Sequence, residues 1–171
     1  MRKLLTITLM LVCLLSAKAQ QAAPKAPELD YVMQLKVKIE NAYTVGETPH
    51  GRRVVIPITG GTFEGPGIKG TVLSGGADYQ LASADGSRTE LEAIYSIKTD
   101  DGVYIHVRNC GIIANGKDSD GKPSFYFKAA PKFEAPADSR YAWLNNAIYV
   151  CSPDWSTPTQ GHITLNVWKV R

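Results

Sequence analysis

Two acidic side chains beside glycines are the strongest candidates for chemistry. Glu64 lies in the glycine-rich segment 60–66, and Asp78 follows Gly75 and Gly76. Closely spaced glycines are typical of sharp strand bends, so we expect both acids where the chain turns. A carboxyl group partly shielded from water has a raised pKa and can act as a general acid or base. The alternative is that each acid only caps a turn or accepts backbone N–H bonds.

A third acid, Glu92, lies in the middle of an alternating segment and could join the other two inside the fold. Two carboxylates that converge on one pocket can divide into acid and base roles. The catalytic candidates are therefore Asp78, Glu64 and Glu92. The alternative for Glu92 is an exposed position on the strand surface.

Four further residues are candidates for binding a substrate. Tyr126 and Trp143 could stack on a ligand, and Arg140 could hold a carboxylate through two hydrogen bonds. Lys128 would be informative if it were buried. The alternatives are that the aromatic residues pack the core or rim, that Arg140 forms a surface ion pair, and that Lys128 is exposed.

No motif in the chain points to a metal or a cofactor. His50, His106 and His162 do not have the spacing of metal ligands. The glycine-rich stretch 60–76 lacks the Gly-Lys-Ser/Thr ending of a phosphate loop, and no Gly-x-Ser-x-Gly is present. We therefore predict neither a metal site nor a cofactor.

The elements that must position these residues are strands. Residues 29–39 alternate strictly, with Leu29, Tyr31, Met33, Leu35, Val37 and Ile39 on one face. Similar alternation and turn signals such as Asp101-Gly102 predict further strands. The fold class is all-β: an antiparallel closed barrel of about 8–10 strands with at most one short helix, near residues 139–145.

The N-terminus has the three parts of a cleavable signal peptide. Arg2 and Lys3 precede an apolar run that ends at Leu15, and small residues at 17 and 19 predict cleavage after Ala19. We expect residues 1–19 to be removed, 20–28 to be a flexible linker and 29–171 to form one barrel domain. The location would be periplasmic or secreted, without membrane insertion after cleavage. Cys110 and Cys151 would remain, as a disulfide pair or as two thiols.

The charge balance argues against a polyanionic partner. Of the 19 basic residues, three lie in the signal segment, which holds no acid, so 16 remain against 16 acidic residues. A net charge near zero gives no electrostatic footprint for nucleic acid. The expected partner is a small organic molecule, and the sequence leaves open whether the protein forms a homo-oligomer.

Several motifs occur in an order that resembles a known family. They comprise residues 45–46, 49–53, 57–66, 75–80, 99–102, 131–134 and 140–145, within a match over 28–170. The chain resembles the domain of unknown function 3237 family, also called uncharacterised protein family 0311. The resemblance implies an antiparallel barrel like those of allene oxide cyclase and the lipocalins, and no settled activity. Lys128 stands where relatives often carry Arg.

Three functions compete on this basis. The first is cofactor-independent acid/base catalysis of the lyase, isomerase or cyclase type on a small organic substrate. The second is a lipocalin-like protein that binds a hydrophobic small molecule without changing it. The third is a structural envelope protein with a filled interior. The chemistry of the barrel interior separates them.

Overall fold

The computed structural model describes residues 23–156 and 160–171. The predicted signal peptide and the first residues of the predicted linker lie outside this part. Residues 23–28 are exposed and belong to no helix or strand. No helix in the described ranges is both long and apolar enough to cross a bilayer.

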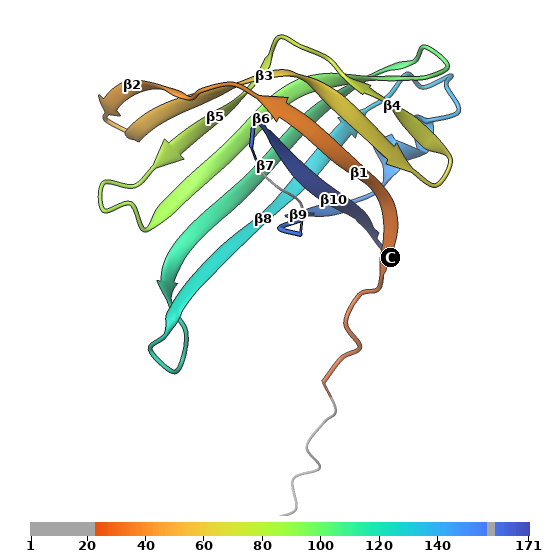
Figure 1. The fold of residues 1–171 in the computed structure, drawn as a ribbon. Helices are drawn as coiled ribbons and strands as arrows, with labels where there is room; N and C mark the ends of the chain where they lie inside the picture. Colours follow the sequence, from red (N-terminus) through yellow and green to blue (C-terminus); the bar gives the residue numbers. More distant parts are fainter. Residues whose placement is uncertain (1–22, 157–159) are drawn as a thin grey trace, which may run out of the picture.

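Ten strands and one short 3₁₀ helix make up the described fold, and most of the chain is strand (Figure 1). In chain order they are β1 (Leu29–Ile39), β2 (Tyr43–Thr48), β3 (Gly51–Gly65), β4 (Ile68–Val72), β5 (Gly76–Ala82), β6 (Arg88–Thr99), β7 (Tyr104–Lys117), β8 (Pro123–Glu134), η2 (Ala142–Asn146), β9 (Tyr149–Pro153) and β10 (His162–Val170).

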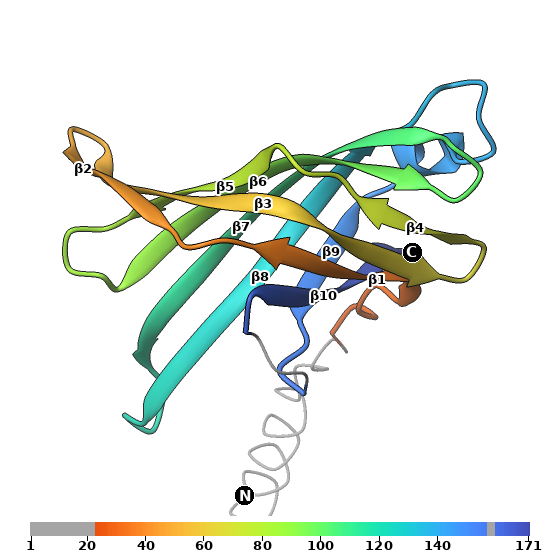
Figure 2. The same cartoon turned by 45° about the horizontal axis from the view of Figure 1, so that its top comes forward.

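The sheet closes into an antiparallel barrel, which confirms the predicted fold class. β1 pairs with β10 on one side and with β3 on the other. β4 and β5 both bridge β3 and β6, and β2 continues the course of β1 along the first part of β3 (Figure 2). The barrel therefore has eight strand positions, although ten segments fill them.

One part of the predicted alternation in β1 is wrong. Met33, Leu35 and Val37 are buried as expected, but Leu29 and Tyr31 are 50% and 45% exposed. A bulge between Tyr31 and Met33 inserts one extra residue into the pairing with β10. The extra residue changes the face of every residue before it, so Val32 is buried and Tyr31 faces outward.

The glycine-rich segment allows β3 to approach β1 closely. Gly61 has φ 136°, and a Cβ atom built on it would lie 2.1 Å from the carbonyl oxygen of Lys36. Only glycine fits such a crossing without moving the backbone. The segment is thus a strand bend at the closure of the barrel.

The interior differs between the two ends of the barrel. At the end covered by η2, buried side chains such as Phe133, Leu144 and Tyr149 fill the space, with the rings of Phe133 and Tyr149 5.1 Å apart and edge to face. The opposite end, where β6, β8 and β10 begin, contains a cavity. The fold therefore places any interior site at that end.

The two cysteines do not form a disulfide, which decides an alternative left open by the sequence. Both are free thiols, Cys110 exposed and Cys151 buried. Cys110 pairs with Ala130 of β8, and Cys151 pairs with the adjacent Ala129. Neighbouring residues of a strand face opposite sides of the sheet, so the two thiols lie on opposite faces of the barrel wall.

Candidate functional site

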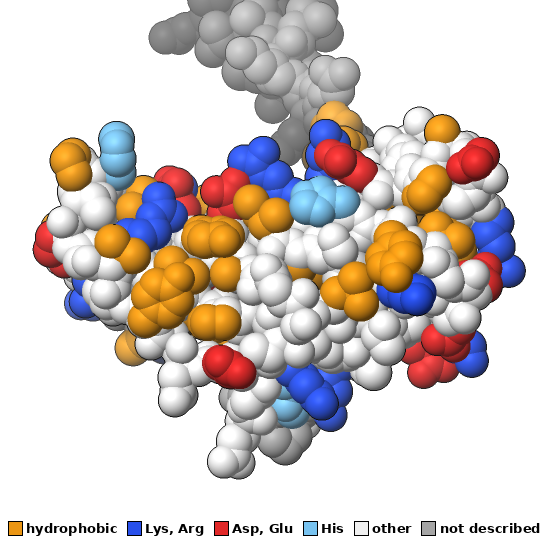
Figure 3. Space-filling model, turned by 90° about the horizontal axis from the view of Figure 1, so that it is seen from above, with side chains coloured by type: hydrophobic (Ala, Val, Ile, Leu, Met, Phe, Trp, Pro, Cys, Tyr) orange, Lys and Arg blue, Asp and Glu red, His pale blue; other side chains and the backbone are white. Residues whose placement is uncertain are grey.

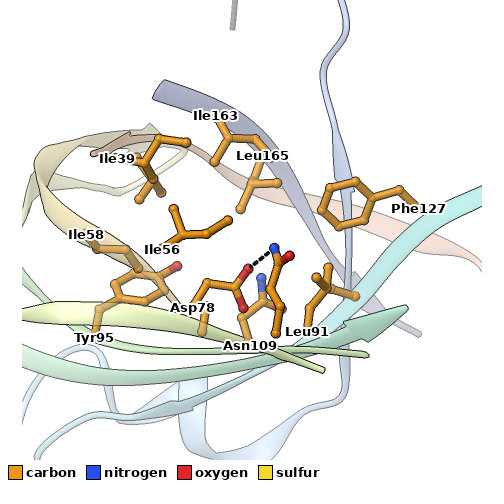
Figure 4. A pocket seen from close by; sticks show the side chains of 14 residues that line it. Ile39, Ile56, Ile58, Asp78, Leu91, Tyr95, Asn109, Phe127, Ile163 and Leu165 are labelled. Atoms are coloured by element: carbon orange, nitrogen blue, oxygen red, sulfur yellow. Dashed lines mark hydrogen bonds between the residues drawn. The ribbon is translucent and has the colours of Figure 1, made fainter. Parts of the chain in front are cut away.

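The interior cavity has a volume of about 100 Å³ and a mainly apolar wall (Figure 4). This is comparable to the roughly 150 Å³ of an engineered apolar cavity that binds benzene. Ten of its lining side chains are hydrophobic: Val37, Ile39, Ile56, Ile58, Leu91, Ala93, Phe127, Ala129, Ile163 and Leu165. The remaining four are Asp78, Gln80, Tyr95 and Asn109.

Asp78 carries the acidic group of this wall. It lies on β5, where it pairs with Ile56 of β3 and Ala93 of β6. Its carboxylate accepts a hydrogen bond from Gln80 Nε2 at 2.8 Å and another from the backbone N–H of Glu92 at 3.1 Å. Residues 78 and 80 share one face of the strand, so the amide of Gln80 holds the carboxyl group in the cavity.

Burial raises the pKa of the Asp78 carboxyl above its ordinary value of 3.8. The two hydrogen bonds that it accepts favour the charged form and oppose this effect only in part. A carboxyl group of this kind holds its proton to a higher pH and can release it to a ligand.

Tyr95 of β6 is the second titratable group of the cavity wall. The residue is 5% exposed, and its hydroxyl points into the cavity on the side of Asp78 (Figure 4). Burial raises its pKa far above the ordinary value, with smaller contributions from the buried Cys151 thiol and from Asp78. Tyr95 therefore stays neutral and can donate a hydrogen bond to a ligand.

Aromatic residues lie beside the cavity. Phe127 lines its wall, and its ring centroid is 6.2 Å from that of Trp155. Trp155 also contacts Phe125 edge to face at 6.0 Å. Phe125 and Trp155 are largely exposed, so this cluster connects the cavity wall with the outer surface.

Glu64 and Glu92 do not share this cavity, so their predicted placement beside Asp78 is wrong. Glu64 is exposed on the outside of β3. Glu92 forms an ion pair with Arg108 on the outer face of β6 and β7. The parity of β6 explains this placement, because Leu91, Ala93 and Tyr95 point inward.

Tyr126 and Lys128 lie on the outer face of β8, away from the cavity. Tyr126 is 51% exposed, and the Lys128 ammonium lies 5.8 Å from its ring centroid. Lys128 Nζ also donates to Ser152 Oγ at 3.0 Å. The structure brings these two predicted binding residues together, but on the wrong side of the wall for an interior ligand.

Arg140 and Trp143 lie at the filled end of the barrel. Arg140 donates to the carbonyl oxygen of Gly67 at 3.1 Å and lies 3.9 Å from Asp101. Asp101 in turn accepts a hydrogen bond from the hydroxyl of Tyr141 at 2.9 Å. These contacts attach the chain before η2 to the β3–β4 and β6–β7 turns at this end of the barrel. Trp143 lies in η2 and is 42% exposed.

The described residues show no cluster of ligand side chains for a metal. No three His, Cys, Asp or Glu residues within 23–156 and 160–171 come close enough together to hold an ion. On the face shown in Figure 3, basic, acidic and hydrophobic side chains are interspersed, and no charge sign dominates.

Sequence reasoning missed Tyr95 and Asn109 as site residues. Both lie at inward positions of alternating strands, and this signal was available for Tyr95 from Leu91 and Ala93. The alternation of side chains along a strand shows which side of the sheet a residue faces, but not its position along the barrel axis. It therefore cannot tell a residue of the packed end from one at the cavity.

Comparison with known proteins gives a consistent assignment. The family model described as "Protein of unknown function (DUF3237)" matches residues 27–170. A UPF0311 protein of Rhodopseudomonas palustris is 36% identical over 135 residues, covering 73% of this chain and 86% of that protein. A UPF0311 protein of Clostridium acetobutylicum is 34% identical over 137 residues, covering 72% and 85%.

Solved structures share the fold. The crystal structure of a conserved protein of unknown function from Rhodopseudomonas palustris has a TM-score of 0.73 at 32% identity, covering 86% of this chain and all of that one. A β-barrel-like protein from Acinetobacter baumannii has a TM-score of 0.73 at 29% identity, covering 88% of this chain and 100% of that chain. A more distant relative, 27% identical over 135 residues (79% of this chain and 76% of that protein), is a hydroalkoxylation enzyme of Penicillium herquei.

Proposed function

The chain belongs to the DUF3237 family, and from that premise we propose that its barrel binds a small, mainly apolar organic molecule and catalyses proton transfer on it with the Asp78 carboxyl. The reaction would be of the lyase, isomerase or cyclase type and would need no added cofactor. The observation that carries the proposal is one carboxyl group, with a raised pKa, on the wall of an otherwise mostly apolar cavity.

The apolar wall explains how such a site would work. It removes water from the ligand and from Asp78, which raises the pKa of the carboxyl group and strengthens its interaction with a developing charge. The Asp78 carboxylate takes a proton from one atom of the ligand, which leaves a negative charge on the ligand, and then returns a proton to another atom of the same ligand. The Tyr95 hydroxyl donates a hydrogen bond to the negative charge that forms. Protons balance over the cycle, so no other reactant is consumed.

The Penicillium herquei relative supports this class of reaction. Hydroalkoxylation adds an O–H bond across a carbon–carbon double bond: the oxygen bonds to one carbon, the proton moves to the other, and no other reactant is consumed. At 27% identity the relative bears on the type of chemistry and not on the substrate of this chain.

The second candidate is a binding protein that leaves its ligand unchanged. The observation in its favour is the lining itself, in which ten of the fourteen side chains are hydrophobic. In this case Asp78 and Tyr95 would only orient a bound molecule.

Deuterium exchange separates the two candidates. Small phenols and conjugated ketones that raise the melting temperature of the protein are incubated with it in D₂O, and carbon-bound deuterium is followed by NMR. We expect exchange with the wild type and a loss of at least about 100-fold in Asp78→Asn, the scale of general acid–base catalysis. Glu92→Gln, which changes a carboxylate outside the cavity, should exchange like the wild type.

The outcomes of this experiment differ for each candidate. Exchange that persists in Asp78→Asn would remove Asp78 from the reaction. Tight binding without exchange in any variant would favour the carrier. If no compound binds, the cavity is not a ligand site.

We also propose export, on the basis of the signal-like segment 1–19. Expression of the full chain in a Gram-negative bacterium should give a periplasmic protein whose N-terminal residue is Gln20. N-terminal sequencing and the intact mass check this outcome. An uncleaved chain in the cytoplasm would contradict it.

A further inference from the structure

Asn109 is a buried amide on the cavity wall with an incomplete set of hydrogen bonds. The residue is 6% exposed and lines the cavity beside Leu91 (Figure 4). Its Nδ2 makes a long contact of 3.7 Å with Cys151 Sγ, and its Oδ1 is buried without any partner. A buried polar atom without a partner destabilises the fold, so its presence calls for an explanation.

The chemistry of the missing partner follows from the two orientations of the amide. With Oδ1 free, the site lacks a donor. With the amide turned over, the Cys151 S–H donates to Oδ1 and the NH₂ group lacks an acceptor. A hydroxyl group both donates and accepts, so it satisfies the amide in either orientation. The Cys151 thiol is neutral in both cases because burial raises its pKa to about 11.

The register of the sheet places this amide at a useful position relative to Asp78. Asp78 pairs with Ala93, and Ala93 pairs with Asn109, so the three residues form one row across β5, β6 and β7. Two strand spacings put the Cα atoms of Asp78 and Asn109 about 10 Å apart. Ala93, which lies between them, has only a methyl group as its side chain, and this leaves space for a ring above it.

From these observations we infer that Asn109 binds a hydroxyl group of the ligand and that the natural ligand is a hydroxylated ring lying over Ala93, with its reacting atom at Asp78. This inference rests on the proposed function and deepens it, since it names the class of ligand. Asn109 is then a positioning residue that sets the orientation of the ligand.

Phenol and benzene are matched probes, because they differ by one hydroxyl group. Their dissociation constants are measured by calorimetry or ligand-observed NMR on the wild type, Asn109→Leu and Glu92→Gln. We expect the wild type to bind phenol about tenfold more tightly than benzene, the gain from one buried hydrogen bond. The preference should vanish in Asn109→Leu and persist in Glu92→Gln, which changes a carboxylate outside the cavity.

A second measurement uses only the wild-type protein and does not depend on the folding of a variant. The side-chain NH₂ signals of Asn109 in a ¹⁵N-labelled sample should shift further with phenol than with benzene, which acts on them only through its ring current. Equal affinity for the two probes, or equal movement of these signals, would overturn the inference while leaving the cavity as an apolar binding site. Failure of both probes to bind would instead contradict the proposed function.

Discussion

Asp78 differs from the other acids of the chain in the surroundings that the barrel gives it. Its hydrogen bonds to Gln80 and to the Glu92 backbone keep the carboxyl group inside an apolar wall. Glu92, on the next strand, points the opposite way and is paired with Arg108. The backbone N–H that holds the candidate acid and the surface carboxylate therefore belong to the same residue, Glu92.

The raised pKa of Asp78 predicts a pH dependence of stability. Because the folded-state pKa lies above the ordinary 3.8, the folded protein holds the proton more strongly than the unfolded chain. The contribution of Asp78 is fully present below about pH 4 and is lost as the pH rises through the folded pKa. The free energy of unfolding should fall by at most about 1.4 kcal/mol per pH unit in that window.

Urea unfolding of the wild type and Asp78→Asn between pH 4 and 8 measures this contribution. The variant lacks the titrating group, so its free energy of unfolding should rise relative to that of the wild type as the pH increases. Glu64→Gln, which changes an exposed carboxyl group, is the control. Parallel pH profiles of wild type and Asp78→Asn would contradict the burial of the charge.

At the scale of the elements, the sequence predicts the strands well because period two and turn residues are local signals. The alternation of β6 places Leu91, Tyr95 and Ile97 inside, as observed. It fails at the bulge in β1, since one inserted residue reverses Tyr31 without a local mark in the sequence. Asp78 could be named as a candidate site residue from the sequence because it is an acid next to glycines. The role of Asn109 could not, because it depends on pairing with β6 and on proximity to Cys151.

The crossing of β1 and β3 also depends on a glycine that has no positive φ. A Cβ atom built on Gly65 would lie 2.0 Å from the carbonyl oxygen of Val32, next to the bulge. Gly65→Ala should lower the free energy of unfolding by roughly 1–3 kcal/mol, the range for overpacking. Gly116 in β7 has nothing within 4 Å of such an atom, so Gly116→Ala is the matched control. Chemical denaturation of both variants measures the difference in the free energy of unfolding. Equal stabilities of the two variants would contradict the close approach of β1 to Gly65.

On the scale of the whole molecule, closure of the barrel creates an inside and an outside that sequence patterns specify only in part. Cys151 is 1% exposed in the core, whereas Cys110 lies on the outer surface. The wall between them is β8 itself, through Ala129 and Ala130. The fold is therefore held by sheet closure and core packing without a bridge between these two thiols.

This sidedness predicts how the two thiols react. Iodoacetamide at neutral pH should modify Cys110 in the folded protein, because it is exposed. Cys151 should react only after unfolding, since it is shielded and burial raises its pKa to about 11, which leaves almost no thiolate. Peptide mass spectrometry before and after urea treatment measures both sites, and dithiothreitol should leave the melting temperature unchanged. A melting temperature that falls on reduction would contradict the two free thiols. Alkylation of Cys151 at the rate of Cys110 in the folded state would contradict the burial of Cys151.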